Sequence, residues 1–158
     1  TAQTVTRFGL GSAPNTWDSL VRAMKALGYS EQELFDGGLV RHGRSGGVYD
    51  TFRNRLMFPV IDVRGNVIGF SGRILGDGEP KYMNSPETIV FSKSHNLFAL
   101  NLAKKSKCGY IILAEGNIDV ASLHQAGFDS AVASLGTSLT PEQARLLSRY
   151  TSEIVMEF

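Results

Sequence analysis

Two carboxylates close together in the sequence are the residues best suited to chemistry. Glu115 directly follows the apolar run of residues 110–114, and Asp119 lies four positions later, at the expected start of a helix. Gly116 between them gives the backbone freedom to turn sharply. Because Mg²⁺ is usually held by one or two protein carboxylates with substrate phosphates and water, this pair predicts a site for a hard cation. The alternative is that Asp119 only complements the helix dipole and that Glu115 is a solvated loop acid.

A second group combines basic, aromatic and amide side chains in a proline-bracketed loop. Residues 80–88 contain Lys81, Tyr82 and Asn84, and Lys93 follows shortly after. Lysine attracts phosphate, tyrosine offers a stacking face for a base, and asparagine forms hydrogen bonds to backbone or sugar. The combination suits single-stranded nucleic acid or a nucleotide, and the alternative is a loop with incidental polar residues.

Three arginines accompany the strands that the middle of the chain predicts. Arg53 and Arg55 flank Asn54 at the period of a strand, so both are expected to project from one face, where they could contact phosphates. Arg73 ends the next expected strand. Exposed arginines are also common on strands without a function. The histidines show no metal-ligand spacing and are interpreted as structural or surface residues: His42, His95 and His124.

Charge is distributed unevenly along the chain, although the formal net charge is only +1. Residues 41–107 contain eleven Lys or Arg and five Asp or Glu, hence a net +6, whereas residues 108–158 carry a net −4. A clustered basic surface is the electrostatic footprint expected for a polyanion such as nucleic acid. A basic face that is merely solvated is the alternative that composition leaves open.

Composition excludes several classes of protein. With 158 residues, 42% of them hydrophobic, and 17 glycines, the chain is neither disordered, collagen-like nor framed by disulfides. It contains no apolar run of the roughly 18 residues that cross a bilayer and no signal peptide, so we expect a cytoplasmic protein without a membrane partner. A single cysteine, Cys108, fits a reducing compartment. The missing initiator Met predicts a piece of a longer protein.

The chain combines two styles of structure. Its first part predicts a helix capped by Asn15, a helix capped by Ser30 and Glu33, a hairpin of strands 56–63 and 67–73, an extended or looped segment 75–88, and a helix 96–105. Its second part predicts strands 110–114, 131–133 and 154–156 alternating with helices 118–126 and 140–149. This β-α-β-α-β order favours a parallel sheet, which binds ligands beyond the carboxyl ends of its strands. Glu115 and the loop 134–138 are expected at that rim.

Several stretches together resemble bacterial replicative DNA primase of the DnaG type, in the order and spacing of that family and over nearly the whole chain. They are RFGLG at 7–11 with Trp17, YDTFRNRLMFP at 49–59, GFSGR at 69–73, PKYMNSPET at 80–88, LAEGNIDV at 113–120 and ASLGT at 133–137. The family usually has an aromatic residue where this chain has Asn117.

The resemblance implies an α/β fold, in which an α+β N-terminal subdomain precedes a partial Toprim β-α-β-α-β sheet. The implied divisions are a basic subdomain over 1–95, a connecting helix over 96–108 and a Toprim domain over 109–158 that stops before the Asp-x-Asp motif. It implies catalytic and metal-binding roles for Glu115 and Asp119. The basic and aromatic residues implied to contact template and nucleotide are Arg53, Arg55, Arg73, Lys81, Tyr82 and Lys93, and the composition of the loop 80–88 adds Asn84.

The implied activity is synthesis of short RNA primers on a single-stranded DNA template from ribonucleoside triphosphates, with Mg²⁺, or alternatively Mn²⁺, as the metal. Zinc, the replicative helicase and single-strand-binding protein would bind regions absent from this chain, and the protein would act near the nucleoid. We expect these 158 residues alone to be inactive in primer synthesis. The alternatives are another Toprim enzyme, such as a topoisomerase or nuclease, and a non-catalytic module that binds single-stranded DNA.

Overall fold

The computed structural model describes residues 1–44, 46–136 and 138–157, which fall into two compact units. The first unit comprises Thr1–Gly9, Pro59–Ile68 and the residues from Ser92 onward, and the second comprises Leu10–Phe58 and Gly69–Phe91. The hairpin near the middle of the chain therefore has its tip in the first unit and its base in the second. No helix in the described ranges has the length and apolar character needed to span a membrane.

The first unit is built on a mostly parallel sheet with the strand order β10-β8-β9-β7. Strand β8 pairs in parallel with both β9 and β10, and β7 pairs antiparallel with β9. The predicted β-α-β-α-β order with parallel strands is therefore confirmed. The strands are β7 (Leu97–Phe98), β8 (Ile111–Ala114), β9 (Ala131–Ser134) and β10 (Ile154–Met156).

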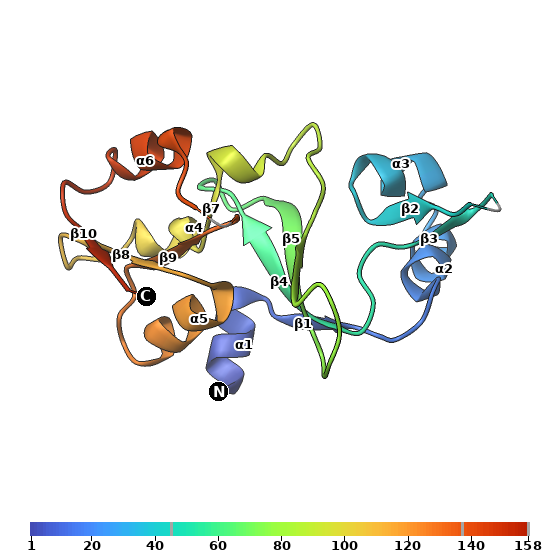
Figure 1. The fold of residues 1–158 in the computed structure, drawn as a ribbon, viewed down its shortest axis with the longest axis horizontal. Helices are drawn as coiled ribbons and strands as arrows, with labels where there is room; N and C mark the ends of the chain where they lie inside the picture. Colours follow the sequence, from blue (N-terminus) through green and yellow to red (C-terminus); the bar gives the residue numbers. More distant parts are fainter. Residues whose placement is uncertain (45, 137, 158) are drawn as a thin grey trace. The chain divides into compact units, whose positions relative to one another are not determined.

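Helices lie on both faces of this sheet, with α6 on one side and α1 and α5 on the other (Figure 1). All four residues of β8 are buried, because successive side chains of a strand point to opposite faces and both faces are covered. The helices of this unit are α1 (Ala2–Phe8), the 3-10 turn η1 (Lys93–His95), α4 (Leu100–Ala103), α5 (Asn117–Gln125) and α6 (Pro141–Leu147).

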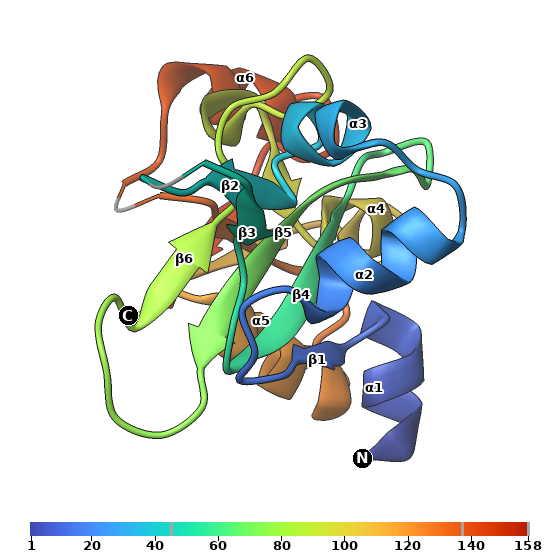
Figure 2. The same cartoon turned by 90° about the vertical axis from the view of Figure 1, so that its right-hand side faces the viewer.

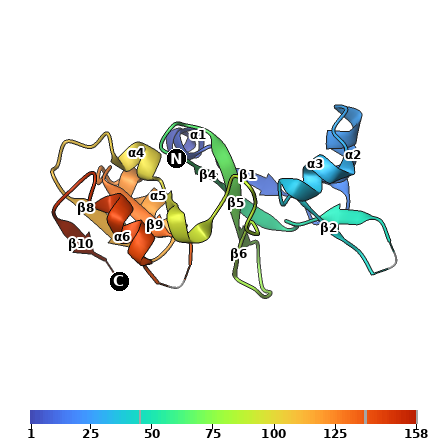
Figure 3. The ribbon, with the colours of Figure 1, turned by 90° about the horizontal axis from the view of Figure 1, so that it is seen from above.

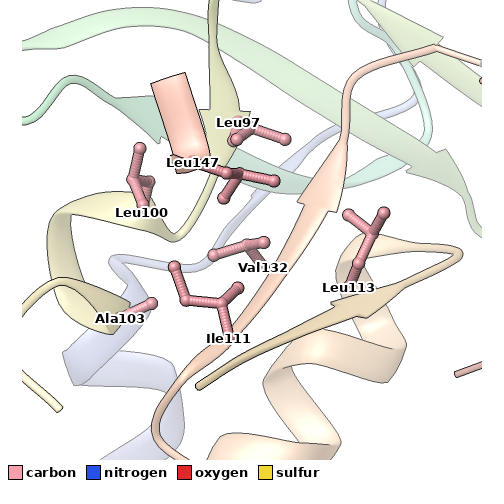
Figure 4. Close-up of a cluster of buried hydrophobic side chains, with 7 residues drawn as sticks. All are labelled: Leu97, Leu100, Ala103, Ile111, Leu113, Val132 and Leu147. Carbon is pink, nitrogen blue, oxygen red and sulfur yellow. The ribbon is translucent and has the colours of Figure 1, made fainter. Parts of the chain in front are cut away.

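Each face of the sheet has its own apolar layer. On one face, Leu100 of α4 and Leu147 of α6 pack with Ile111 and Leu113 of β8 in a single cluster (Figure 4). Elsewhere in this unit, the ring of Phe8 in α1 stacks on Phe98 of β7 at 5.7 Å and meets the ring of His124 in α5 edge-on at 5.1 Å. These contacts hold α1 and α5 in place, and α5 carries one of the two candidate carboxylates.

The second unit contains a sheet with the order β1-β4-β5-β6 and a separate ribbon of β2 and β3. Figure 2 shows the strands of the sheet side by side, and Figure 3 shows α2 and α3 next to the ribbon. The predicted hairpin is confirmed as β4 and β5. The elements are β1 (Gly11–Ala13), α2 (Ser19–Ala26), α3 (Glu31–Asp36), β2 (Val40–His42), β3 (Val48–Asp50), β4 (Arg55–Ile61), β5 (Val67–Ile74) and β6 (Tyr82–Asn84).

Two helix starts that the sequence predicts are confirmed by their capping boxes. The Ser30 hydroxyl accepts from the Glu33 amide at 3.2 Å, and the Glu33 carboxylate accepts from the Ser30 amide at 2.8 Å. Thr140 and Gln143 exchange equivalent bonds at 3.0 and 3.1 Å. Each box satisfies amide groups that the first helical turn would otherwise leave unpaired.

The helix expected after Asn15 begins later than predicted. Helix α2 starts at Ser19, and Trp17 precedes it with 66% of its surface exposed. The buried carboxylate of Asp50 accepts hydrogen bonds from the amides of Leu20 at 2.8 Å and Val21 at 3.0 Å. A residue 30 positions downstream therefore caps the helix in place of Asn15.

The predicted helix over 96–105 is also wrong in length. Only Leu100–Ala103 is helical, because Leu97 and Phe98 pair with Ser134 and Ala133 as strand β7. The segment 75–88, expected to be extended or looped, contains the short strand β6, which pairs with β5. Helix α1 and the short strands β1 to β3 were not predicted, since each is short and is held by contacts distant in sequence.

The buried side chain of His124 makes the stability of the first unit depend on pH. Its Nε2–H donates to the carbonyl of Ala131 at 2.9 Å, and Nδ1 has no hydrogen-bond partner among the described residues. Burial, assisted by the nearby positive charge of Arg7, lowers the pKa of His124 below its ordinary value of 6.5, although the bond to Ala131 opposes this shift. The folded state thus favours neutral imidazole.

We expect unfolding stability to be complete above pH 6.5 and to fall as the pH drops below 6.5, because the unfolded chain then binds a proton that the folded chain resists. Denaturant titrations from about pH 8 to about pH 5 measure this. His124→Gln should flatten the dependence relative to the native chain, whereas His95→Gln, at an exposed position, should retain it. Identical profiles for all three proteins would contradict the assignment.

Candidate active site

Glu115 and Asp119 lie together at the carboxyl edge of the parallel sheet. Glu115 follows the last residue of β8, and Asp119 is in the first turn of α5. The register pairs Ala114 with Ala133, so that Ser134 at the end of β9 reaches the same edge. Both carboxylates are exposed. The rim expected from the sequence is therefore present, and it presents two anionic side chains to solvent.

Two details of this rim differ from the sequence interpretation. Gly116 caps α5 with φ −140° and ψ 165°, an extended conformation that any residue adopts, so the backbone conformation itself does not require glycine there. Asn117, where the family usually has an aromatic residue, is 5% exposed. It is therefore buried beside the rim. Thr137, in the predicted rim loop, lies outside the described residues.

The carboxylates fit part of a divalent-cation site. Oxygen donors on one or two side chains are what Mg²⁺ takes from a protein when phosphates and water supply the remaining ligands. Within the ranges that the structure describes, no three His, Cys, Asp or Glu side chains gather into a metal-binding group. A divalent ion bound by Glu115 and Asp119 would therefore take its further ligands from bound substrate, solvent or other residues.

Arg53 belongs to an aromatic cluster in the second unit. Its guanidinium lies 4.0 Å from the ring centre of Trp17 and 5.1 Å from that of Tyr49, and it donates to the carbonyl of Asp50 at 2.6 Å. A cavity of about 550 Å³, lined in part by the same two rings and by His42, adjoins the cluster. The sequence predicted a helical position for Trp17 and no functional role for Tyr49. Both residues belong to the stretches that resemble primase, which was the available signal that they matter.

Arg55 does not share a strand face with Arg53, contrary to the expectation from their spacing. Asn54 between them has φ 51°, in the left-handed region, which breaks the alternation of the strand. Arg55 is 4% exposed and donates to the carbonyls of Gly72 at 3.1 Å and Pro80 at 3.0 Å. Burial, and secondarily the charge of Arg53, lower the pKa of Arg55.

The β5–β6 ribbon gathers most of the other predicted basic and polar residues. Its register places Arg73 opposite Tyr82 and Ser71 opposite Asn84, so these side chains share one face. Lys81 is exposed directly before β6. The Arg73 Nε is buried and has no hydrogen-bond partner in the described part of the chain.

Lys93 belongs to the first unit instead. It begins η1, and its carbonyl accepts from the Gln143 side chain at 2.8 Å. The same amide group donates to the Asn96 carbonyl at 2.9 Å, so buried Gln143 links the start of α6 to η1. The backbone that carries Lys93 is thereby held to the same unit as Glu115 and Asp119.

Two known protein families match consecutive parts of the chain. Residues 1–104 match the N-terminal domain of the DNA primase catalytic core, and residues 109–158 match the Toprim domain. The chain is 52% identical over 157 residues to the DNA primase of Clostridium acetobutylicum, covering 99% of the chain and 26% of that protein. It is 44% identical over 157 residues to that of Deinococcus radiodurans, covering 98% and 28%. The chain thus spans about a quarter of the length of these relatives.

Solved primase structures show the same similarity. The catalytic core of the Escherichia coli primase matches with a TM-score of 0.89 and 41% identity over 99% of this chain and 50% of that one. A DnaG catalytic domain bound to ssDNA matches with a TM-score of 0.88 and 41% identity, covering 99% and 51%. The RNA polymerase domain of Mycobacterium tuberculosis DnaG with an overhang DNA duplex scores 0.91 at 37% identity, covering 99% and 52%. These matches confirm the resemblance, and the chain belongs to the DnaG family of DNA primases.

Proposed function

We propose that this chain is part of a primase that synthesises RNA primers on single-stranded DNA by metal-dependent nucleotidyl transfer. The placement of Glu115 and Asp119 at the carboxyl end of β8, beside the end of the parallel strand β9, carries this proposal. It is supported by the match of residues 1–104 to the primase core, which other Toprim enzymes such as topoisomerases are not expected to share.

Toprim primases use divalent metal ions, and we assign the metal-binding role in this chain to Glu115 and Asp119. Mg²⁺ is the proposed ion, with Mn²⁺ as the alternative. A divalent ion bound there would neutralise charge that develops on the attacking 3′-oxygen and on the departing pyrophosphate. Glu115 and Asp119 would orient the reacting phosphates through their ligand positions, and no covalent protein nucleophile is required.

The basic and aromatic residues are proposed to bind the template and the ribonucleoside triphosphates. Exposed Lys81 and half-buried Arg73 supply cationic contacts to phosphate, and Tyr82, which is 38% exposed, supplies a stacking face. Asn84 shares the face of Tyr82, and Arg53 and Lys93 are proposed to add charge. A relative bound to ssDNA supports single-stranded DNA as the ligand.

The longer protein is proposed to bind the helicase, single-strand-binding protein and structural zinc through other regions. It is proposed to act in the cytoplasm at the nucleoid, where its DNA template lies. We also retain the division into a basic subdomain over 1–95, a connecting segment over 96–108 and a Toprim domain over 109–158.

Binding of single-stranded DNA tests the basic surface directly. We expect the chain to bind a fluorescein-labelled oligodeoxythymidylate weakly, with log affinity falling linearly against log salt by about 0.7 per phosphate neutralised. Lys81→Gln should reduce the slope by about 0.7, because it removes one contact. Lys25→Gln removes the same charge from an exposed ion pair with Glu31 and should leave the slope unchanged. Salt-independent binding, or equal effects of both variants on the slope, would contradict the proposed contact between Lys81 and the DNA phosphates.

A further inference from the structure

Arg55 is a buried cation whose hydrogen-bond partners are neutral. It is 4% exposed, and its guanidinium donates to the carbonyls of Gly72 and Pro80 at 3.1 and 3.0 Å and reaches that of Lys81 at 3.5 Å. No ion pair to Arg55 is found in the described residues. Buried charges in proteins are usually paired, so an arginine held by carbonyls alone points to a role in fixing backbone.

The carbonyls that Arg55 holds lie in β5 and at the end of the connection to β6. Gly72 belongs to β5, whereas Pro80 and Lys81 close the connection that leads into β6 (Figure 2). The Lys81 carbonyl also accepts from the amide of Ile74 at 3.0 Å, the last bonded pair before the loop opens. Arg55 therefore stabilises the closing end of the loop.

The neighbouring residue holds the opening end of the same loop. The Asn54 side chain donates to the Leu75 carbonyl at 2.9 Å, and the Leu75 amide donates to the Asn54 carbonyl at 2.9 Å. Two consecutive residues thus bind both ends of the connection. Gly72 leaves room for this arrangement, since a Cβ there would stand 2.9 Å from the Cδ of Arg55.

We propose that Arg55 is a positioning residue, which sets where Lys81 and Tyr82 stand on the β5–β6 ribbon and does not itself contact nucleic acid. The inference rests on the proposed function, in which those two side chains meet template or nucleotide. With only 4% of Arg55 exposed, a phosphate has little access to this guanidinium. Lysine cannot replace arginine here, because a single ammonium group lacks the planar fork that spans the carbonyls of β5 and of the connection to β6.

A double-mutant cycle in DNA binding tests this role. Arg55→Met and Lys81→Gln are each expected to weaken binding of a labelled oligodeoxythymidylate about fivefold. Because Arg55 acts through Lys81, the two losses should not add. The affinity of the double variant for the oligodeoxythymidylate should stay within about twofold of that of the single variant with the lower affinity. Arg55→Lys keeps the charge and should still fail to restore binding. Additive losses, or full rescue by lysine, would show that Arg55 acts as an independent cation and overturn the proposal.

Hydrogen exchange gives a readout that does not depend on DNA. Arg55→Met and Arg55→Lys should raise amide exchange at Ile74 about tenfold, while Lys81→Gln leaves it unchanged and Val21 in α2 reports that the unit stays folded. Unchanged exchange at Ile74 in both Arg55 variants would overturn the positioning role. If the native chain shows no salt-dependent binding, the proposed function of the ribbon fails, and the exchange result alone decides whether Arg55 positions the loop.

Discussion

Glu115→Gln in the full-length protein that carries this chain is expected to lower ribonucleotide incorporation on single-stranded DNA by roughly 100-fold or more. Glutamine keeps the shape of the side chain and removes the negative charge at the carboxyl end of β8. A hard cation prefers carboxylate oxygen, so the variant loses a strong ligand at the reacting phosphates. Radiolabelled primer synthesis with Mg²⁺ measures the effect.

Template binding separates this role from a structural one. Glu115 is exposed and follows the strand, so Glu115→Gln should leave DNA affinity and thermal unfolding unchanged. Glu153→Gln, at another exposed position of the same unit, is the matched control and should retain full synthesis. Equal synthesis by native protein and Glu115→Gln would place the metal elsewhere. Absence of synthesis by the native protein would instead reject the primase assignment for the longer protein.

Asp50→Ala is expected to destabilise the second unit by about 3 kcal/mol. The carboxylate is 2% exposed and accepts from the Leu20 and Val21 amides and from the Ser19 hydroxyl, the last at 3.2 Å. Alanine removes these acceptors and leaves donors of the first turn of α2 without partners. Denaturant unfolding followed by the fluorescence of Trp17 measures the loss.

Asp18→Ala is the informative control, because Asp18 is the residue that immediately precedes α2 in the sequence. Its side chain makes no capping hydrogen bond and forms an exposed ion pair with Arg22 at 3.3 Å. Its loss should therefore cost less than about 1 kcal/mol. If Asp18→Ala cost as much as Asp50→Ala, the long-range cap would be wrong. The Asp50 backbone amide also donates to the Trp17 carbonyl at 2.8 Å, and alanine keeps this bond, so the loss in Asp50→Ala reports the side-chain cap.

The parallel sheet and the position of Glu115 could be predicted from sequence because both follow from local patterns and chain order. Residues 111–114 are wholly apolar, and Thr140, Pro141 and Gln143 form a complete helix start. Once strands alternate with helices, right-handed crossovers bring the carboxyl ends of β8 and β9 to one edge. The residue after β8 must then lie at the ligand-binding rim.

The environment of the basic residues could not be predicted, because it depends on contacts between distant segments. The sequence alone determined that Arg53 and Arg55 stand at strand spacing. Only the tertiary structure decided that Arg55 is buried, with its guanidinium bonded to the carbonyls of Gly72 and Pro80. It likewise decided that the side chain of Asp50, not that of Asn15, caps the start of α2. Local spacing predicts which way a side chain points only while the backbone stays regular, and the left-handed Asn54 interrupts it here. Burial and long-range hydrogen bonds then determine what each charge contacts.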